Sequence, residues 1–225
     1  MKENIYLVDN IIEARKEVSN RINKLSQIDD FELSIEYLKA VHKYLFHDFL
    51  VSSGEFRNYN LKKSEIIIND HSVKYTDYHN IETNLRYDFE EEKKINYKYL
   101  EPDKQIKKIA EFTARIWSTH PFIEGNTRTT SIFIQKYLKY LGFSTNDEYF
   151  KTNSKYFRNA LVKASYYNQI YKVTQDYMPL MKFYKKLLYD NTIELKLSDL
   201  IVKEMFTIPN DIEQAKTKIK NKWIS

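Results

Sequence analysis

Residues 119–131 hold the densest group of chemically useful side chains, in the order Thr-His-Pro-Phe-Ile-Glu-Gly-Asn-Thr-Arg-Thr-Thr-Ser. His120 offers an imidazole, a group that can take a proton from an attacking hydroxyl near neutral pH. Glu124 can ligate Mg²⁺, which prefers carboxylate and phosphate oxygens to an all-protein cage. The segment therefore offers a candidate base and a candidate metal ligand on one loop.

A helix is predicted to begin directly after this loop, at Gly125-Asn126-Thr127-Arg128. Backbone N–H groups at the start of a helix form an anion site. Gly125 allows a ligand to approach the backbone closely, and Arg128 can donate two hydrogen bonds to phosphate oxygens. An anion cradle, a metal carboxylate and a base on one loop together favour phosphoryl or nucleotidyl transfer.

Apolar residues at helical spacing predict the elements that position this loop. The helix before it begins at Pro102, a favourable first helical residue, and the helix after it runs from 127 to about 141, with Gly142 as its C-terminal cap. Asp9 or Asn10 is expected to cap the first helix. Further helices are expected over 9–26, 33–50, 81–89, 154–167 and 174–190.

Residues 64–78 break the helical pattern. Ile66, Ile67 and Ile68 precede Asn69-Asp70, and the segment 72–75, which contains Val73, follows. Two β-prone runs around a turn dipeptide predict a short β-hairpin. With only three glycines and four prolines in 225 residues, few tight turns are available, so a mostly helical chain is expected.

The composition excludes several classes of protein. The chain has no cysteine, which excludes disulfides, thiol catalysis and Cys-ligated metal sites. Its net charge of +5 is scattered, which makes nucleic acid an unlikely partner. No apolar run has the ~20 residues of a membrane span, and no signal peptide begins the sequence. A cytoplasmic protein is expected, with one domain over 1–190 and a helical tail over 191–225.

The string from His120 to Arg128 resembles the signature of the Fic (filamentation-induced-by-cAMP) domain family, His-x-Phe-x-(Asp/Glu)-Gly-Asn-x-Arg, at every fixed position. Three further segments are similar to the family: Gly54-Glu55-Phe56-Arg57, the expected hairpin, and residues 156–161. The resemblance covers roughly residues 35–190. The richness of the sequence in Lys, Ile, Asn and Tyr is typical of an AT-rich bacterial genome. The resemblance implies a mainly α, Fic-like helical core with a small β-hairpin flap.

The resemblance also implies an activity: AMPylation, the Mg²⁺-dependent transfer of AMP from ATP to a Ser, Thr or Tyr hydroxyl of a target protein. His120 would be the general base, Phe122 the buried anchor of the loop, and Glu124 the Mg²⁺ ligand. The nucleotide would lie on Gly125, Asn126, Thr127, Arg128, Tyr156 and Asn159. The flap, with Ile66, Ile67, Ile68 and Val73, would pair with the backbone of the target.

Two positions depart from the commonest form of the motif. Thr127 stands where glycine is usual, and Ser131 stands where a second arginine is frequent. A phosphotransferase of the same fold and a degenerate, inactive binding protein therefore remain alternatives. The family's inhibitory (Ser/Thr)-x-x-x-Glu-(Gly/Asn) motif has one poor match, Ser144 with Glu148. Control by a small inhibitory partner protein, by the tail or by target availability is left open.

Other candidate residues are given structural roles. Arg57 is expected to form a salt bridge or a cap within the core. His42 and His47 are five residues apart on a predicted helix, so they do not share a face and make poor metal partners.

Overall fold

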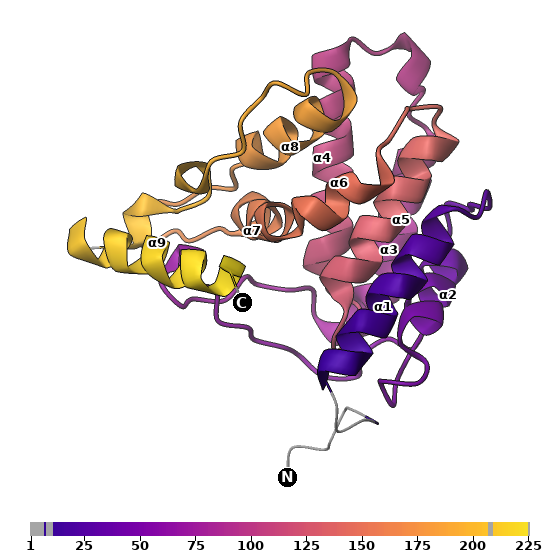
Figure 1. The fold of residues 1–225 in the computed structure, drawn as a ribbon, viewed down its shortest axis with the longest axis horizontal. Coiled ribbons are helices and arrows are strands. Elements are labelled where there is room, and N and C mark those ends of the chain that lie inside the picture. The colour runs from indigo at the N-terminus through magenta and orange to yellow at the C-terminus, as the bar shows by residue number, and fades with distance from the viewer. Residues whose placement is uncertain (1–6, 8–10, 207–208, 225) are drawn as a thin grey trace. The chain divides into compact units, whose positions relative to one another are not determined.

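The computed structural model describes residue 7 and residues 11–206 and 209–224, and most of them are helical (Figure 1). The helices are α1 (Ile11–Ser26), α2 (Ile35–Phe46), α3 (Ile81–Lys93), α4 (Pro102–Thr119), α5 (Asn126–Tyr140), α6 (Asp147–Thr152), α7 (Ser154–Ser165), α8 (Met178–Leu188) and α9 (Pro209–Ile224). The predicted mainly helical class is confirmed. Along the described part of the chain, no helix is both long and apolar enough to span a bilayer.

The chain forms two compact units, each built from separate stretches of sequence. The first unit takes its described residues from the chain up to Asn60, from Thr76–Asn96 and from Thr119–Asp147. The second contains Leu61–Tyr75, Tyr97–Ser118 and the residues from Glu148 onward. The predicted division at residue 190 stays a prediction, although the second unit does bury Leu200, Ile201, Val202 and Met205 of the expected tail.

The core of the first unit lies where α1, α2 and α5 meet. Apolar residues of these helices and of the turn after α2 form one cluster, which contains Val18, Leu25, Val41, Leu45, Phe46, Leu50 and Ile132. Beside it, Phe89 of α3 stacks on Phe133 of α5, with the ring centroids 5.7 Å apart. These contacts pack α5 against α2. The motif loop directly precedes α5 in the sequence.

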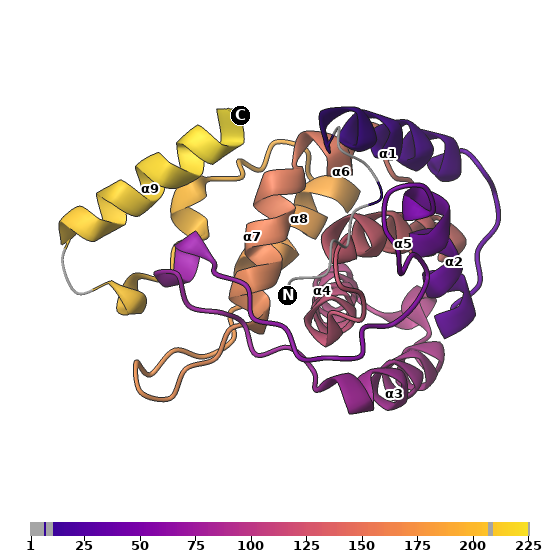
Figure 2. The same cartoon turned by 90° about the horizontal axis from the view of Figure 1, so that it is seen from below.

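The core of the second unit is aromatic. Phe150 of α6, Phe157 of α7 and Phe183 of α8 lie with ring centroids 4.9–5.2 Å apart. Tyr184 is also buried, and its hydroxyl lies 2.7 Å from the hydroxyl of Thr113 on α4. Figure 2 shows α7 and α8 side by side, joined by an orange loop that projects away from them.

The expected helices are present and differ mainly at their ends, while α6 was not expected from the sequence. α2 is shorter than the expected 33–50, because Ser34 caps its start and turns follow Phe46. α8 begins at Met178, where the Asp176 carboxylate accepts from the Met178 N–H. Gly142 ends α5 with φ +89°, as expected of a C-terminal cap. The caps proposed at Asp9 and Asn10 lie outside the described residues.

The expected β-hairpin is wrong in its strands. Ile66–Ile68 form a turn of 3₁₀ helix, and the segment has a single antiparallel bridge, between Glu65 and His71. The turn dipeptide itself is where the sequence predicts it, since Asn69 and Asp70 have φ of +52° and +59°. The three isoleucines therefore lie inside the connection between the bridged residues, where no strand pairing reaches them.

Candidate active site

Arg57 holds the backbone of the motif loop. Its guanidinium Nε donates to the His120 carbonyl at 2.8 Å, and its backbone N–H donates to the Pro121 carbonyl at 2.8 Å. Further guanidinium donors reach the carbonyls of Tyr59, Thr76 and Thr119. Arg57 is only 3% exposed, so these bonds are shielded from water. It caps carbonyls within the core, as expected, but the carbonyls belong to the candidate site.

His120 has an unusual backbone conformation. Its φ of +48° lies in the left-handed region, which costs a non-glycine residue roughly 1–2 kcal/mol. The bond from Arg57 to its carbonyl offsets that cost and holds the residue in place. His120 is 3% exposed, so its imidazole is sheltered within the first unit.

Phe122 and Asn126 close the loop by exchanging two hydrogen bonds. The Phe122 N–H donates to Asn126 Oδ1 at 2.9 Å, and Asn126 Nδ2 donates to the Phe122 carbonyl at 2.7 Å. The Phe122 ring is 1% exposed and packs against Phe56 at 5.7 Å. The prediction that Phe122 is buried is confirmed. The Asn126 side chain therefore closes the loop, and its predicted contact with a nucleotide stays a prediction.

Gly125 and Arg128, at the start of α5, both lie against the ring of Phe46. Gly125 has φ +81°, and a Cβ built on it would overlap the ring of Phe46. The Arg128 guanidinium carbon lies 4.7 Å from the centroid of the same ring. Phe46 thus requires a glycine at the helix start and orients the arginine one turn later. Thr127 and Arg128 are half-buried beside it.

Glu124 lies half-buried directly before the helix start. Among the described residues, no three His, Asp or Glu side chains are placed to hold a metal ion together. A single carboxylate fits Mg²⁺ that takes its other ligands from phosphate and water. The residues present therefore fit a metal that arrives with a nucleotide, and they do not fit a metal caged by protein alone.

Tyr156 and Asn159 belong to the second unit, on α7. Both are buried, and the Tyr156 hydroxyl lies 3.5 Å from the Asp199 carboxylate. Burial, with Asp199 nearby, raises the pKa of the Tyr156 phenol well above its usual range. Their predicted contact with a nucleotide stays a prediction.

The flap residues also belong to the second unit. Ile67, Ile68 and Val73 are buried, while Ile66 is half-buried. Within that unit, the Val202 N–H donates to the Ile67 carbonyl at 3.0 Å, and Asn69 Nδ2 donates to the Met205 carbonyl at 3.0 Å. Part of this backbone is therefore occupied by the chain itself. Docking of a target on this segment stays a prediction.

The structure brings six of the predicted residues together in the first unit: His120, Glu124, Gly125, Asn126, Thr127 and Arg128. Sequence reasoning gave no functional role to Arg57 or Phe46, which hold these residues. Arg57 contacts a loop 63 positions away, and no local pattern announces such a contact. The sequence signal that points to Arg57 is the similarity of residues 54–57 to the Fic family.

Comparison with known proteins agrees with this geometry. Residues 32–138 match the model of the Fic/DOC family, and no curated protein matches the sequence. Solved structures of Bartonella proteins are similar to the chain. The N-terminal Fic domain of a Bartonella effector protein from Bartonella sp. AR 15-3 has a TM-score of 0.63 at 16% identity, with 84% of this chain and 85% of that chain covered.

Two further structures hold nucleotides. The BepC protein from Bartonella tribocorum, with bound AMPPNP, has a TM-score of 0.61 at 15% identity and covers 79% of this chain and 85% of that one. A Fic domain from Bartonella quintana with bound ADP has a TM-score of 0.61 at 15% identity, with 84% and 91% covered. At these identities the likeness shows the fold: the chain has the Fic fold.

Proposed function

We propose that this Fic-fold chain is a protein adenylyltransferase, which moves AMP from ATP to a Ser, Thr or Tyr hydroxyl of a target protein. The observation that carries the proposal is the loop at His120, whose backbone Arg57 holds beside a glycine-led helix start. The complete motif string and the match over residues 32–138 support it. So do the nucleotides bound to two proteins of the same fold.

In the proposed reaction His120 takes the proton of the target hydroxyl as its oxygen attacks the α-phosphorus of ATP. The bond between the α-phosphorus and the bridging oxygen breaks, and pyrophosphate leaves. Arg128 and the backbone at the start of α5 hold the phosphate oxygens, and Glu124 orients the metal. Mg²⁺, when bound, neutralises phosphate charge. A cytoplasmic setting is part of the same proposal.

One observation favours a second candidate. Thr127 replaces the usual glycine of the motif and stands half-buried at the phosphate end of the helix, where it alters the cradle. A phosphotransferase would move the γ-phosphate instead of AMP. A degenerate binding protein would bind nucleotide and transfer nothing.

Labelled ATP separates these three functions. We expect label from the α-phosphate, and none from the γ-phosphate, to reach the target protein, with an intact-mass increase equal to AMP. Label from the γ-phosphate alone would instead indicate a phosphotransferase, and nucleotide binding without either label would indicate the binding protein.

Replacement of His120 tests its role as base. We expect His120→Ala to lower transfer by at least ~10²–10⁴-fold while ATP binding is retained, because a base acts on the chemical step. His79→Ala is the matched control, since His79 is exposed and lies in the same unit. Full activity of His120→Ala would show that His120 is not the general base.

A further inference from the structure

His42 of α2 joins two backbone segments through its buried ring. Its Nδ1 lies 2.8 Å from the Gly54 nitrogen, and its Nε2 lies 3.0 Å from the Glu124 carbonyl oxygen. The residue is 1% exposed, so water does not compete for either bond. The longer of the two links spans 82 residues of sequence, from His42 to Glu124 in the motif loop.

The two contacts determine which ring nitrogen carries the proton. The Gly54 N–H is an obligatory donor, so Nδ1 must be the unprotonated acceptor. The proton then lies on Nε2, which donates to the Glu124 carbonyl. Burial, with the charge of Arg128 nearby, lowers the pKa of His42 to about 4, although the bond to Glu124 opposes the shift. The ring is therefore neutral, with one donor and one acceptor, and both are used.

The faces of the ring are occupied as well as its edges. His42 stacks on Phe122 of the motif, with the centroids 3.8 Å apart and the planes 10° from parallel. Phe46, one turn further along α2, lies 4.8 Å from His42 and supports Gly125 and Arg128. Residues four apart on a helix share a face, so α2 presents a continuous template to the loop from 122 to 128.

Gly54 is suited to its side of the link. Its φ is +80°, and an added Cβ would lie 2.8 Å from the Cβ of Lys43. A side chain at this position would push the turn, and with it the Gly54 N–H, away from the ring. Glycine at this position therefore lets the turn reach Nδ1, while the motif loop is held by the separate bond from Nε2.

The geometry points to His42 as a positioning residue for the transfer reaction, which sets the backbone at Glu124 through its Nε2 hydrogen bond. The inference rests on the proposed function for its kinetic consequence, but the placement of the loop can be measured without any reaction. The hydrogen bond from His42 to Glu124 governs transfer, and the hydrogen bond to Gly54 does not.

Two substitutions at this position separate the bonds. His42→Gln places an amide donor near the position of Nε2, so it can keep the bond to the Glu124 carbonyl and lose the one to Gly54. His42→Asn places an amide oxygen near Nδ1, so it can keep the bond to Gly54 and lose the one to Glu124. Each variant removes the stack on Phe122, which makes each the control for the other.

The kinetic comparison uses the full chain, ATP and a target protein to which the unmodified chain transfers AMP. We expect His42→Asn to lower kcat about 100-fold, since displacement of about 1 Å in a catalytic loop costs that much, with the KM for ATP nearly unchanged. His42→Gln should stay within several-fold of the unmodified chain. Equal losses in both variants, or full activity of His42→Asn, would overturn the proposal.

Amide hydrogen exchange of the peptide 119–130 gives a readout independent of activity. We expect exchange at least tenfold faster in His42→Asn than in His42→Gln, and equal rates would overturn the proposal. If the unmodified chain transfers no AMP, the proposed function fails and this comparison alone decides the role of His42. If His42→Asn does not fold, His42→Gln decides: native-like exchange supports the proposal, and fast exchange overturns it.

Discussion

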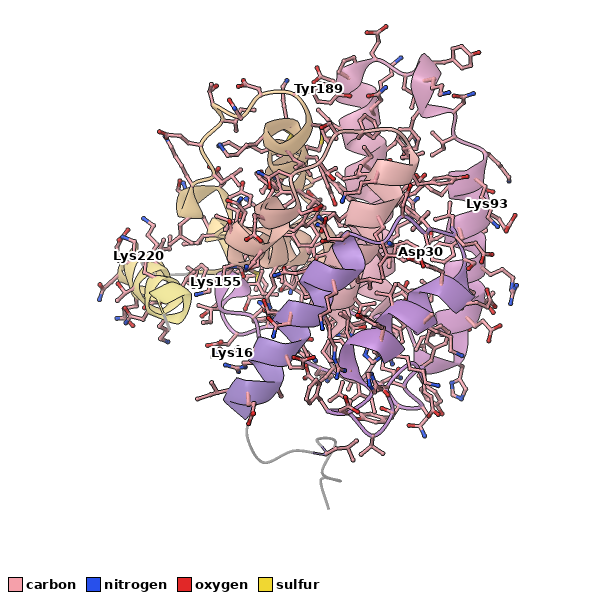
Figure 3. All side chains as sticks on the ribbon, turned by 45° about the vertical axis from the view of Figure 1, so that its right-hand side comes forward. Lys16, Asp30, Lys93, Lys155, Tyr189 and Lys220 are labelled. Atoms are coloured by element: carbon pink, nitrogen blue, oxygen red, sulfur yellow. The ribbon has the colours of Figure 1, made fainter. Side chains whose placement is uncertain are left out.

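Two buried cations of the first unit, Arg57 and Lys136, bind backbone carbonyls in different surroundings. Each is 3% exposed. Arg57 donates to carbonyls from three stretches of sequence, the loop at His120 among them. Lys136 donates to the carbonyls of Leu25, at 3.2 Å, and Ile28, and pairs with Asp30 at 2.7 Å, all in one stretch at the end of α1. Figure 3 labels Asp30 in the segment that joins α1 to α2.

The difference shows how the chemistry of a cation suits its task. A guanidinium has five donors in a rigid plane and can hold several segments at once, whereas an ammonium is a compact charge with three donors. Arg57 thus organises a loop with a left-handed residue, where orientation matters. Lys136 closes the end of a helix, where the need is to satisfy the last carbonyls. Arg57 should therefore govern activity, and Lys136 should govern stability.

The strongest test of this contrast is Arg57→Lys. The charge remains, but an ammonium cannot reach carbonyls on three segments, so some become buried and unsatisfied. We expect the free energy of unfolding to fall by about 3 kcal/mol, since each such loss costs about 1–3 kcal/mol. Transfer measured on the folded protein should fall at least tenfold beyond what the unfolded fraction explains.

The matched control for that variant is Arg86→Lys. Arg86 is an exposed residue of α3 whose partner is Glu82, four positions earlier. Its replacement should change the free energy of unfolding by less than about 0.5 kcal/mol. Native-like activity of Arg57→Lys would show that the loop keeps its shape without the guanidinium, and the contrast with Lys136 would be lost.

Lys136→Met should have the opposite profile. The variant leaves the carbonyls of Leu25 and Ile28 without this donor, so urea unfolding should show a loss of about 1–3 kcal/mol. The kcat of the folded protein should be unchanged, because Lys136 contacts α1 and the segment after it rather than the motif loop. A fall in kcat as large as that of Arg57→Lys would mean that the two cations are not functionally distinct.

The smallest expected effect is on the pH dependence of stability. The hydrogen bond from Lys136 lowers the pKa of Asp30 below its ordinary 3.8. Because the folded-state pKa is the lower one, the pair stabilises the protein above pH ~4, and that contribution is lost as pH falls through the folded-state value. The Asp30 side chain is 56% exposed, so screening limits the contribution to about 0.5 kcal/mol.

Unfolding of Asp30→Asn at several pH values measures this contribution. The variant should be less stable than the unmodified chain at pH 7, and the gap should narrow as the pH falls below the ordinary pKa of an aspartate. A gap that is constant with pH would show that ionisation of Asp30 does not contribute to stability.

The sequence predicts the local structure of the motif loop better than the distant residues that support it. The motif from His120 to Arg128 is contiguous, so its helix start and turn are local properties and were predicted correctly. Arg57 and His42 act over long separations, which local patterns do not encode. The run Ile66–Ile68 was misjudged because three β-branched residues suit a buried 3₁₀ turn as well as a strand, and burial decided between them.

The separations in sequence around the motif loop bear on how the protein folds during synthesis. The loop is tied to His42 and Arg57, which precede it by 82 and 63 residues. Contacts between residues so far apart in sequence form late, because the entropic cost of closing a long loop must be overcome first. The stretches of the first unit are complete only once Asp147 has left the ribosome. We therefore expect a nascent chain stalled earlier to lack protection at residues 119–130, which pulsed hydrogen exchange would reveal.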